Sequence, residues 1–476
     1  MSIDNELCFM SARSLANAVR DRSVSAREVM TAFLAQIGRV NPQINAIVAK
    51  LDDEKCLSLA DRADRRLARG DDIGPLHGLP FAFKDLDAAV GFPLTRGSPI
   101  FKDFMPAEDS VLVERLKRAG VIPIGKTNVS EFGMGSHTYN EVYGTTLNPY
   151  DLTKSAGGSS GGAGAALAAG LLPLASGSDL GGSLRNPANF NNVVALRPTV
   201  GLVPSAPTAL PFLGFTVKGP MARSVADVAF LLSAMAGADL RDPSCYPAEP
   251  SVFAKSLQRD FNNTRIAWCL DLGGLPLDRR VRAVLEIQRK TFIDLGCVVE
   301  DACPDLGGAD EIFLTLRAWN YWHTLGALLE KHRHGMKAEA VWQIESGSKL
   351  AGSDVANAMA WHGELMERFR RFLEQYEFLV CAVNQVPPFE ATLRWPREIE
   401  GVVMENYLSW MKSAYWITPT FCPAISVPAG FTPDGLPVGI QIVGRHRADF
   451  SVLQIAHAFE QATGVGKTRP AFAVDR

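Results

Sequence analysis

Hydrophobic and polar residues follow two patterns along this chain: amphipathic stretches with helical spacing, and short runs that are almost wholly apolar. The amphipathic stretches predict helices, which we place at residues 11–21, 25–40, 54–69, 110–119, 161–169, 224–236, 281–295 and 451–463. The apolar runs predict strands, which we place at residues 44–48, 80–83, 121–124, 172–175, 265–270, 298–300, 424–427 and 436–443. The two kinds of element alternate over most of the chain.

Local signals mark the ends of several elements. Ser25 and Glu28 have the spacing of a capping box at the start of a helix, and we expect Asn41-Pro42 to end that helix. Gly70 stands where a left-handed residue commonly follows the last helical turn. Residues 432–435, with the sequence TPDG, are typical of a turn between two strands.

Alternating short strands and helices predict an α/β fold, built on a largely buried, mixed β-sheet. The sequence has no internal repeat and no low-complexity linker, so we expect one domain over residues 1–476. Residues from about 310 to 412 differ, because they are helix-rich and hold six of the eight tryptophans. These large aromatic side chains either pack in the core or form a helical cover over an apolar substrate pocket. They are Trp319, Trp322, Trp342, Trp361, Trp395 and Trp410.

Composition excludes several classes of protein. Of the 476 residues, 47% are hydrophobic and 21% are charged, as in ordinary globular proteins. The net charge of −3 implies no basic face, so we expect no nucleic-acid partner. The start of the chain lacks the features of a signal peptide, and the longest weakly polar stretch, residues 161–175, is too short to cross a bilayer. We therefore expect a cytoplasmic protein with no membrane partner.

The eight cysteines are scattered and include no Cys-x-x-Cys pair. In a long chain without an export signal, this pattern predicts reduced core residues rather than disulfides or metal ligands. We expect neither a metal nor a cofactor.

Two serines surrounded by glycines are the candidate catalytic residues. Ser159 lies in GGSSGG at residues 157–162, and Ser183 lies in SDLGGSLR at residues 178–185. Glycine lets backbone N–H groups approach a substrate closely. A serine flanked by such groups has the parts of a nucleophile and its oxyanion hole.

The base that would activate such a serine is not a histidine. None of the eight histidines lies in either serine motif, and His77 is expected to make a structural hydrogen bond. A buried, neutral lysine is an alternative base, because loss of water disfavours the ammonium form. Lys84 follows an apolar run and fits this role. From the residues alone, a surface lysine or an ion-pair partner of Asp85 or Asp87 is the more ordinary interpretation.

Six segments together resemble the amidase signature family of serine hydrolases. They span nearly the whole chain and, although each is common alone, their combination is specific. They are GLPFAFKD (78–85), GKTN (125–128) with Glu131, GGSSGG (157–162), DLGGSLR (179–185), GPMARS (219–224) and PVGIQIVG (437–444). The resemblance implies the amidase-signature fold, with a central mixed β-sheet flanked by helices on both faces.

The resemblance also assigns roles to residues. It implies that Ser183 is the nucleophile, Ser159 the bridging serine in a cis peptide with Gly158, and Lys84 the base. Backbone N–H groups of the segment Leu180, Gly181, Gly182 and Ser183 would form the oxyanion hole.

Neighbouring residues are expected to support the site. Asp179 and Arg185 would fix the glycine loop, and Lys126 and Asn128 would pin adjacent loops. Ser160 either joins the catalytic network or makes a local hydrogen bond. Met134 and Gly135 fall where relatives approach the substrate, although Met134 is equally suited to core packing. The chain departs from the family at residues 187–192, which read PANFNN where many relatives have PAAFCG.

These features predict a metal-free amidohydrolase that cleaves a carboxylic amide to an acid and an amine or ammonia, with esterase side activity. Its partner is a small-molecule amide, and an aromatic, arylalkyl or anilide amide is preferred. A homodimer is the family's usual assembly.

Three alternatives remain. The glutamine-handling subunit of the tRNA-dependent amidotransferase shares all these motifs. An α/β-hydrolase would use Ser159 in a Gly-x-Ser-x-Gly elbow with His446 or His457 downstream. A non-enzymatic protein would use the glycine loops to bind an anion.

Overall fold

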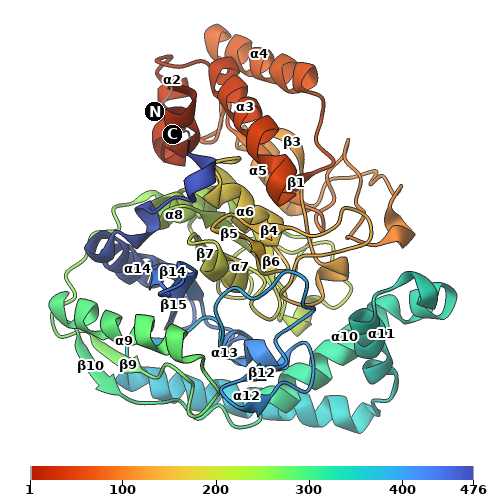
Figure 1. Cartoon of the computed structure of the whole chain (residues 1–476), viewed down its shortest axis with the longest axis vertical. Helices are drawn as coiled ribbons and strands as arrows, with labels where there is room; N and C mark the ends of the chain where they lie inside the picture. The colour runs from red at the N-terminus through yellow and green to blue at the C-terminus, as the bar shows by residue number, and fades with distance from the viewer. Residues whose placement is uncertain (1–2, 475–476) are drawn as a thin grey trace.

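The computed structural model describes residues 3–474 and is built around a mixed sheet of eight strands (Figure 1). In spatial order these are β10 (Val298–Asp301), β9 (Arg265–Trp268), β11 (Phe378–Ala382), β15 (Pro437–Gly444), β14 (Ala424–Phe431), β7 (Val194–Arg197), β8 (Val217–Ala222) and β6 (Leu174–Asp179). β9 pairs in parallel with β10 and β11, and the remaining pairs are antiparallel. The predicted mixed α/β sheet is therefore confirmed.

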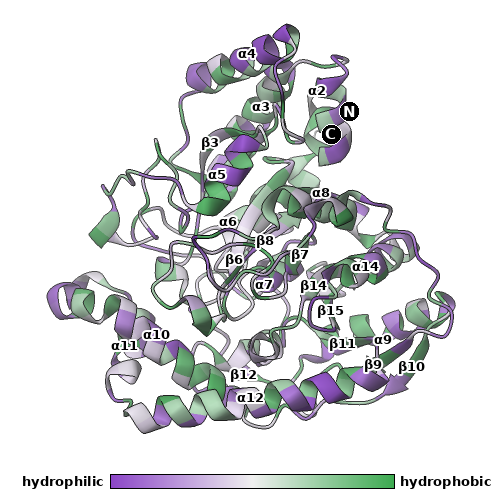
Figure 2. Cartoon of the chain, turned by 180° about the vertical axis from the view of Figure 1, so that it is seen from behind, coloured by the Kyte–Doolittle hydropathy of each residue, from purple (hydrophilic) through white to green (hydrophobic). Residues whose placement is uncertain are grey.

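Helices cover both faces of this sheet. The larger ones are α8 (Val225–Met235), α9 (Arg279–Asp294), α10 (Ala309–His332), α12 (Gly352–Gln375) and α14 (Asp449–Thr463). The helix α11 (Ala338–Ser348) packs against α10 instead. Alternate residues of β11 enter different hydrophobic clusters, because successive side chains of a strand point to opposite faces. Phe378 and Val380 pack with α8, α9 and α14, whereas Leu379 and Cys381 pack with α10 and α12. Figure 2 shows green and purple segments alternating along α12, as an amphipathic covering helix requires.

A smaller sheet lies beside the N-terminal helices (Figure 1). It contains β1 (Ile47–Val48), β3 (Ile122–Thr127) and β2 (Pro80–Lys84). Around it and in the centre are α1 (Ile3–Phe9), α2 (Ala12–Arg20), α3 (Ala26–Ile44), α4 (Asp53–Arg69), α5 (Val111–Arg118), α6 (Gly161–Ala168) and α7 (Arg185–Phe190). Short pieces complete the fold: β4 (Leu147–Asn148), β5 (Asp151–Ser155), β12 (Glu398–Ile399), β13 (Val402–Val403) and α13 (Lys412–Tyr415).

The predicted end of the second long helix is wrong. The capping box of Ser25 and Glu28 is present, but α3 continues through Pro42 to Ile44 and leaves only two residues for β1. A proline in the last turn removes a single helical hydrogen bond. The Asn41 side chain offsets this loss, because it accepts hydrogen bonds from the N–H groups of Ala46 and Ile47. Left-handed Asn45 then ends the helix.

The segment from about 310 to 412 is helix-rich as expected, since it contains α10, α11 and α12, but it also contains the unpredicted strand β11. Residues 378–382 form a short apolar run that is buried throughout, and such a run has no helical or alternating period to reveal it. The strands β7 and β8 and the short helix α7 were likewise not predicted from the sequence.

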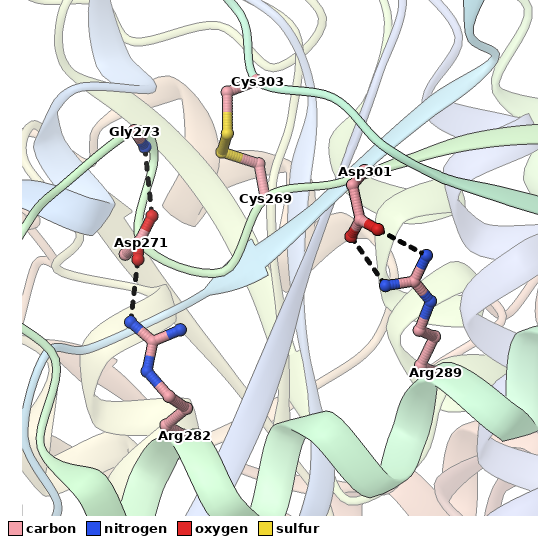
Figure 3. Close-up of a disulfide and its surroundings, with 7 residues drawn as sticks. All are labelled: Cys269, Asp271, Gly273, Arg282, Arg289, Asp301 and Cys303. Atoms are coloured by element: carbon pink, nitrogen blue, oxygen red, sulfur yellow. Dashed lines mark hydrogen bonds and ion pairs between the residues drawn. A yellow bond between two sulfur atoms is a disulfide. The ribbon is translucent and has the colours of Figure 1, made fainter.

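The expectation that all cysteines are reduced is also wrong. Cys269 and Cys303 form a disulfide, and their Cα atoms are 5.2 Å apart. Cys269 follows β9 and Cys303 follows β10, and the parallel pairing of these strands brings them together. Figure 3 shows the bond, with the ion pairs Arg289–Asp301 and Arg282–Asp271 nearby. Two cysteines separated by 34 residues give no local spacing signal.

We expect the disulfide to stabilise the fold by closing a loop of chain. Cys303→Ser should lower the free energy of unfolding by about 3–4 kcal/mol, because the unfolded chain regains the entropy of that loop. Chemical denaturation with and without a reductant measures this loss. Cys245→Ser is the control, since Cys245 is a free thiol. Equal stability of the oxidised and reduced protein would contradict the prediction.

Within residues 3–474, no helix has both the length and the apolar character needed to cross a membrane.

Candidate active site

Lys84 is the last residue of β2 and is completely buried. Its Nζ atom lies 2.9 Å from Ser159 Oγ, 2.7 Å from Ser160 Oγ and 3.0 Å from Ser178 Oγ. The Ser178 carbonyl is 3.3 Å away. Three hydroxyls from two glycine-rich segments therefore surround one amine. No residue pattern indicated Ser178, which lies near the end of β6.

The environment of Lys84 favours its neutral form. Burial first, and the positive charge of Lys218 second, lower the pKa of Lys84 to about 7, against the opposing effect of Asp87 and Asp179. An amine with this pKa is largely uncharged at slightly alkaline pH, whereas an ordinary lysine is not.

Neutral Lys84 has one lone pair and two N–H groups. Ser160 Oγ and the Ser178 oxygens can accept those two hydrogens, which leaves the lone pair for the Ser159 hydroxyl. The arrangement therefore suits proton transfer from Ser159.

The Ser159 loop depends on close backbone packing. The Gly158–Ser159 peptide is cis, as the family resemblance implied. A Cβ atom at Gly158 would lie 2.9 Å from the backbone nitrogen of His137, and one at Gly161 would lie 2.3 Å from Thr138 Oγ1. Only glycine fits at both positions. Ser159 is 1% exposed and is held at the start of α6.

Ser183 lies in the turn between β6 and α7 and is 8% exposed, more than Ser159 or Lys84. Its carbonyl accepts a hydrogen bond from the Ser160 N–H at 3.2 Å, which joins the two serine loops. Asp179 organises the turn by accepting from the N–H groups of Gly182 (2.8 Å) and Leu184 (3.2 Å).

This geometry changes the expected oxyanion hole. The N–H of Gly182 already donates to Asp179, so Gly182 is removed from the set of donors. Among residues 3–474, the N–H groups of Leu180, Gly181 and Ser183 have no protein acceptor. A Cβ at position 181 would lie 2.7 Å from the Phe313 ring, so only glycine fits at position 181.

Asp179 and Arg185 form the buried ion pair that the sequence suggested, with Arg185 Nε and Nη2 each 3.0 Å from a carboxylate oxygen. Arg197 is a second cation on the same carboxylate, at 3.2 Å. Burial raises the pKa of Asp179, but the two arginines and the Gly182 N–H outweigh it and hold the pKa well below its usual range.

Asp179→Asn should lower the free energy of unfolding by about 3–5 kcal/mol, because it leaves two buried guanidinium groups without a counter-charge. Urea denaturation followed by fluorescence measures the change. Asp294→Asn is the matched control: its pair with Lys290 is exposed, so about 0.5 kcal/mol is expected. A loss no larger than in the control would contradict the role of Asp179.

Met134 and Gly135 lie between the serines and the helical segment. Met134 is buried against α10 and α11, and its carbonyl accepts from Lys337 Nζ at 2.6 Å. A Cβ at Gly135 would touch Tyr407, and one at Gly133 would lie 3.5 Å from Ser159 Oγ. The segment 133–135 thus connects the Ser159 loop to aromatic side chains.

The tryptophans of the helix-rich segment differ in burial. Trp410 is buried in the core and also lines a narrow cavity beside Met134 and Tyr407. Trp342 and Trp361 are 42% and 46% exposed. The helix-rich segment therefore supplies core packing through Trp410, and its role as a cover over a substrate pocket stays a prediction.

Other predicted supporting residues bind adjacent loops. Lys126 Nζ donates to the Asp87 carbonyl at 2.5 Å, and Asn128 donates to the Gly144 carbonyl and to Thr146. His77 makes a structural hydrogen bond to the Ala63 carbonyl.

The residues that depart from the family pattern have their own partners. Asn191 donates to the carbonyls of Ala156 and Pro187, both at 2.7 Å, and Asn189 accepts from the Gly439 N–H. Asn192 has a φ of 53°, which asparagine tolerates better than most residues. These asparagines link α7 to the Ser159 loop and to β15.

The histidines offer no base to Ser159 among the described residues. His137, the nearest in sequence, bonds Ser155 and the Ala391 carbonyl through its two ring nitrogens. His457 lies 3.8 Å from Glu460 on α14. The geometry thus gives no support to a Ser–His pair.

Comparison with known proteins gives consistent matches. The profile of a family described as Amidase matches residues 28–453. An acylamidase of Rhodococcus erythropolis is 36% identical over 98% of this chain and 98% of its own length. One subunit of the glutamyl-tRNA(Gln) amidotransferase of Thermosynechococcus vestitus is 32% identical over 94% of this chain and 96% of its own.

Solved structures match over the same length. A bacterial aryl acylamidase of the amidase signature family superposes with a TM-score of 0.91 at 26% identity, covering 98% of this chain and 99% of the other. A 6-aminohexanoate cyclic dimer hydrolase gives a TM-score of 0.87 at 27% identity, with the same coverage of both chains.

Proposed function

Because the chain belongs to the amidase family and is a hydrolase of amide C–N bonds, we propose that it cleaves small aromatic, arylalkyl or anilide amides through an acyl-enzyme on Ser183. The amidase-signature fold is confirmed. The observation that carries the proposal is the buried contact of Lys84 with Ser159.

The proposed mechanism begins with a proton transfer. Neutral Lys84 accepts the proton of Ser159, which in turn takes the proton of Ser183. Ser183 Oγ attacks the amide carbonyl, and the N–H groups of Leu180, Gly181 and Ser183 stabilise the oxyanion, each donor contributing roughly 3–4 kcal/mol in comparable sites.

The same residues complete the reaction. The proton held by Lys84 returns through Ser159 to the leaving nitrogen, because an amine departs poorly unless it is protonated. Water then repeats the sequence on the acyl-enzyme and releases the acid. The alcohol of an ester departs more readily than the amine of an amide, so esterase side activity is expected.

Two observations support an aromatic substrate. The helices α10 and α11 pack on Phe132 and Met134, next to Gly133 and Ser159. Tyr407, beside Gly135, contacts the rings of Trp342 and Trp395. The similarity to a bacterial aryl acylamidase agrees with this preference.

A glutamine-hydrolysing component of a tRNA-dependent amidotransferase is the second candidate, since amidotransferase relatives are 31–32% identical. Glutamine hydrolysis that depends on a second, copurifying protein would favour it. The homodimer and the cytoplasmic location stay predictions from the sequence.

Labelling with a fluorophosphonate, combined with a panel of anilides and arylalkyl amides, tests the proposed function. We expect one adduct, mapped by peptide mass spectrometry to Ser183, and release of amine from the panel. An adduct on Ser159, or no hydrolysis of any amide or ester, would overturn the proposal.

The pH dependence of kcat/KM should report the charge of Lys84. Protonated Lys84 cannot accept a proton, so activity should fall about tenfold per pH unit below its pKa of about 7 and level off above it. Initial rates from pH 5 to 9 measure the profile. A flat profile over this range would contradict a lysine base.

A further inference from the structure

A second lysine lies behind the catalytic amine. Lys218 is on β8, directly opposite Ser178 in the β6–β8 ladder, and Ser178 is one of the serines that hold Lys84. The Lys218 side chain is 14% exposed and forms an ion pair with Asp87, which is 1% exposed. The reaction steps above use neither Lys218 nor Asp87.

Asp87 is tied to Lys84 through the turn that follows β2. Its N–H donates to the Lys84 carbonyl at 2.9 Å. One carboxylate oxygen binds Lys218, and the other is buried without a hydrogen bond among the described residues. Lys126 reaches only the Asp87 carbonyl, so Lys218 is the single ion-pair partner of this carboxylate in the described chain.

A buried carboxylate near an amine favours the ammonium form, unless another cation neutralises it. We propose that Lys218 is a positioning residue for the Lys84 base: by neutralising Asp87, it stops that carboxylate from holding Lys84 in its charged, inactive form. This inference rests on the proposed function, in which neutral Lys84 accepts the proton.

The remaining charged groups around this cluster have partners of their own. Lys126 lies 3.9 Å from Asp85, and Asp179 is held by two arginines. The other titratable and charged groups that interact with this cluster or with its neighbours are Asp85, Lys126, Asp179, Arg185, Arg197, Arg96, Asp109 and Tyr143. In agreement with the geometry, Lys218 lowers the pKa of Lys84 and Asp87 raises it.

Two single substitutions should move the pH profile in opposite directions. Lys218→Met leaves the Asp87 carboxylate free to stabilise the Lys84 ammonium. The acidic limb of the pH profile, the range in which kcat/KM falls as the pH decreases, should therefore shift to higher pH by about one unit. Asp87→Asn leaves the Lys218 cation unpaired, so the limb should shift to lower pH by about the same amount. The double variant should return the limb close to that of the unmodified enzyme.

Two further variants separate charge from packing. Lys218→Arg keeps the cation and should keep the limb in place. Lys154→Met removes a lysine of similar exposure, 19%, from its pair with Glu390 and should also leave the limb unchanged. Should Lys218→Met fail to fold, as judged by circular dichroism, the shift of Asp87→Asn to lower pH decides the matter.

The rate of fluorophosphonate labelling at Ser183, measured against pH, gives the same limb without a substrate. The role of Lys218 would be overturned if Lys218→Met and Asp87→Asn shifted the acidic limb in the same direction. It would also be overturned if these variants lowered the labelling rate without moving the limb. Full turnover in Ser183→Ala or Lys84→Met would instead overturn the proposed function, so the two failures are distinguishable.

Discussion

Ser183→Ala is expected to reduce amide turnover by roughly 10⁴- to 10⁶-fold, because loss of the nucleophile removes the acyl-enzyme route and leaves only binding and oxyanion stabilisation. Single-turnover and steady-state assays with an anilide substrate measure the loss. Fluorophosphonate labelling should disappear in the same variant.

The matched control is Ser176→Ala. Ser176 is also a buried serine of β6, and its hydroxyl has no hydrogen-bond partner among the described residues. This variant should retain activity and labelling. Turnover in Ser183→Ala within tenfold of the unmodified enzyme would contradict Ser183 as the nucleophile and favour Ser159 in that role.

Lys84→Met should have the second largest effect. The methionine fills a similar volume without a lone pair, so both deprotonation of the nucleophile and protonation of the leaving group are lost. Loss of general acid–base catalysis typically costs about 10²- to 10⁴-fold. Amide hydrolysis should fall further than ester hydrolysis, because only the amide needs a protonated leaving group. Paired kcat/KM values for an anilide and the matching phenyl ester measure the difference.

Lys154→Met serves as the control here too, since that lysine lies outside the site and pairs with Glu390. The remaining rate of Lys84→Met should also lose the acidic limb near pH 7. Equal losses for amide and ester would contradict the role of Lys84 in protonating the leaving nitrogen.

Sequence-based inference was most accurate where the signal is local. The cap of α3 and the left-handed end of α4 follow from residues within one helical turn of each boundary. Inference failed where the partner is distant: β11 is an apolar run that becomes a strand only because β9 and β15 lie on either side of it.

In the candidate site, too, the sequence indicated residues with a local signal but not contacts between distant residues. Glycine spacing indicated Ser159, Ser183 and the backbone donors, because close approach and unusual φ values are properties of the residues themselves. The motif did not reveal that the Gly182 N–H is already occupied by Asp179. It did not indicate Ser178, whose hydroxyl reaches Lys84 across 94 positions of sequence.

The amino-acid sequence by itself determined the α/β class and the family resemblance, since residue type and spacing encode them directly, and the resemblance implied the three residues proposed for the relay. Tertiary structure alone decided the charge environment of Lys84. Its pKa depends on complete burial and on a cation 134 positions away, Lys218, which pairs with Asp87 at a separation of 131. Desolvation and Coulomb forces act through space, so only the folded chain specifies them.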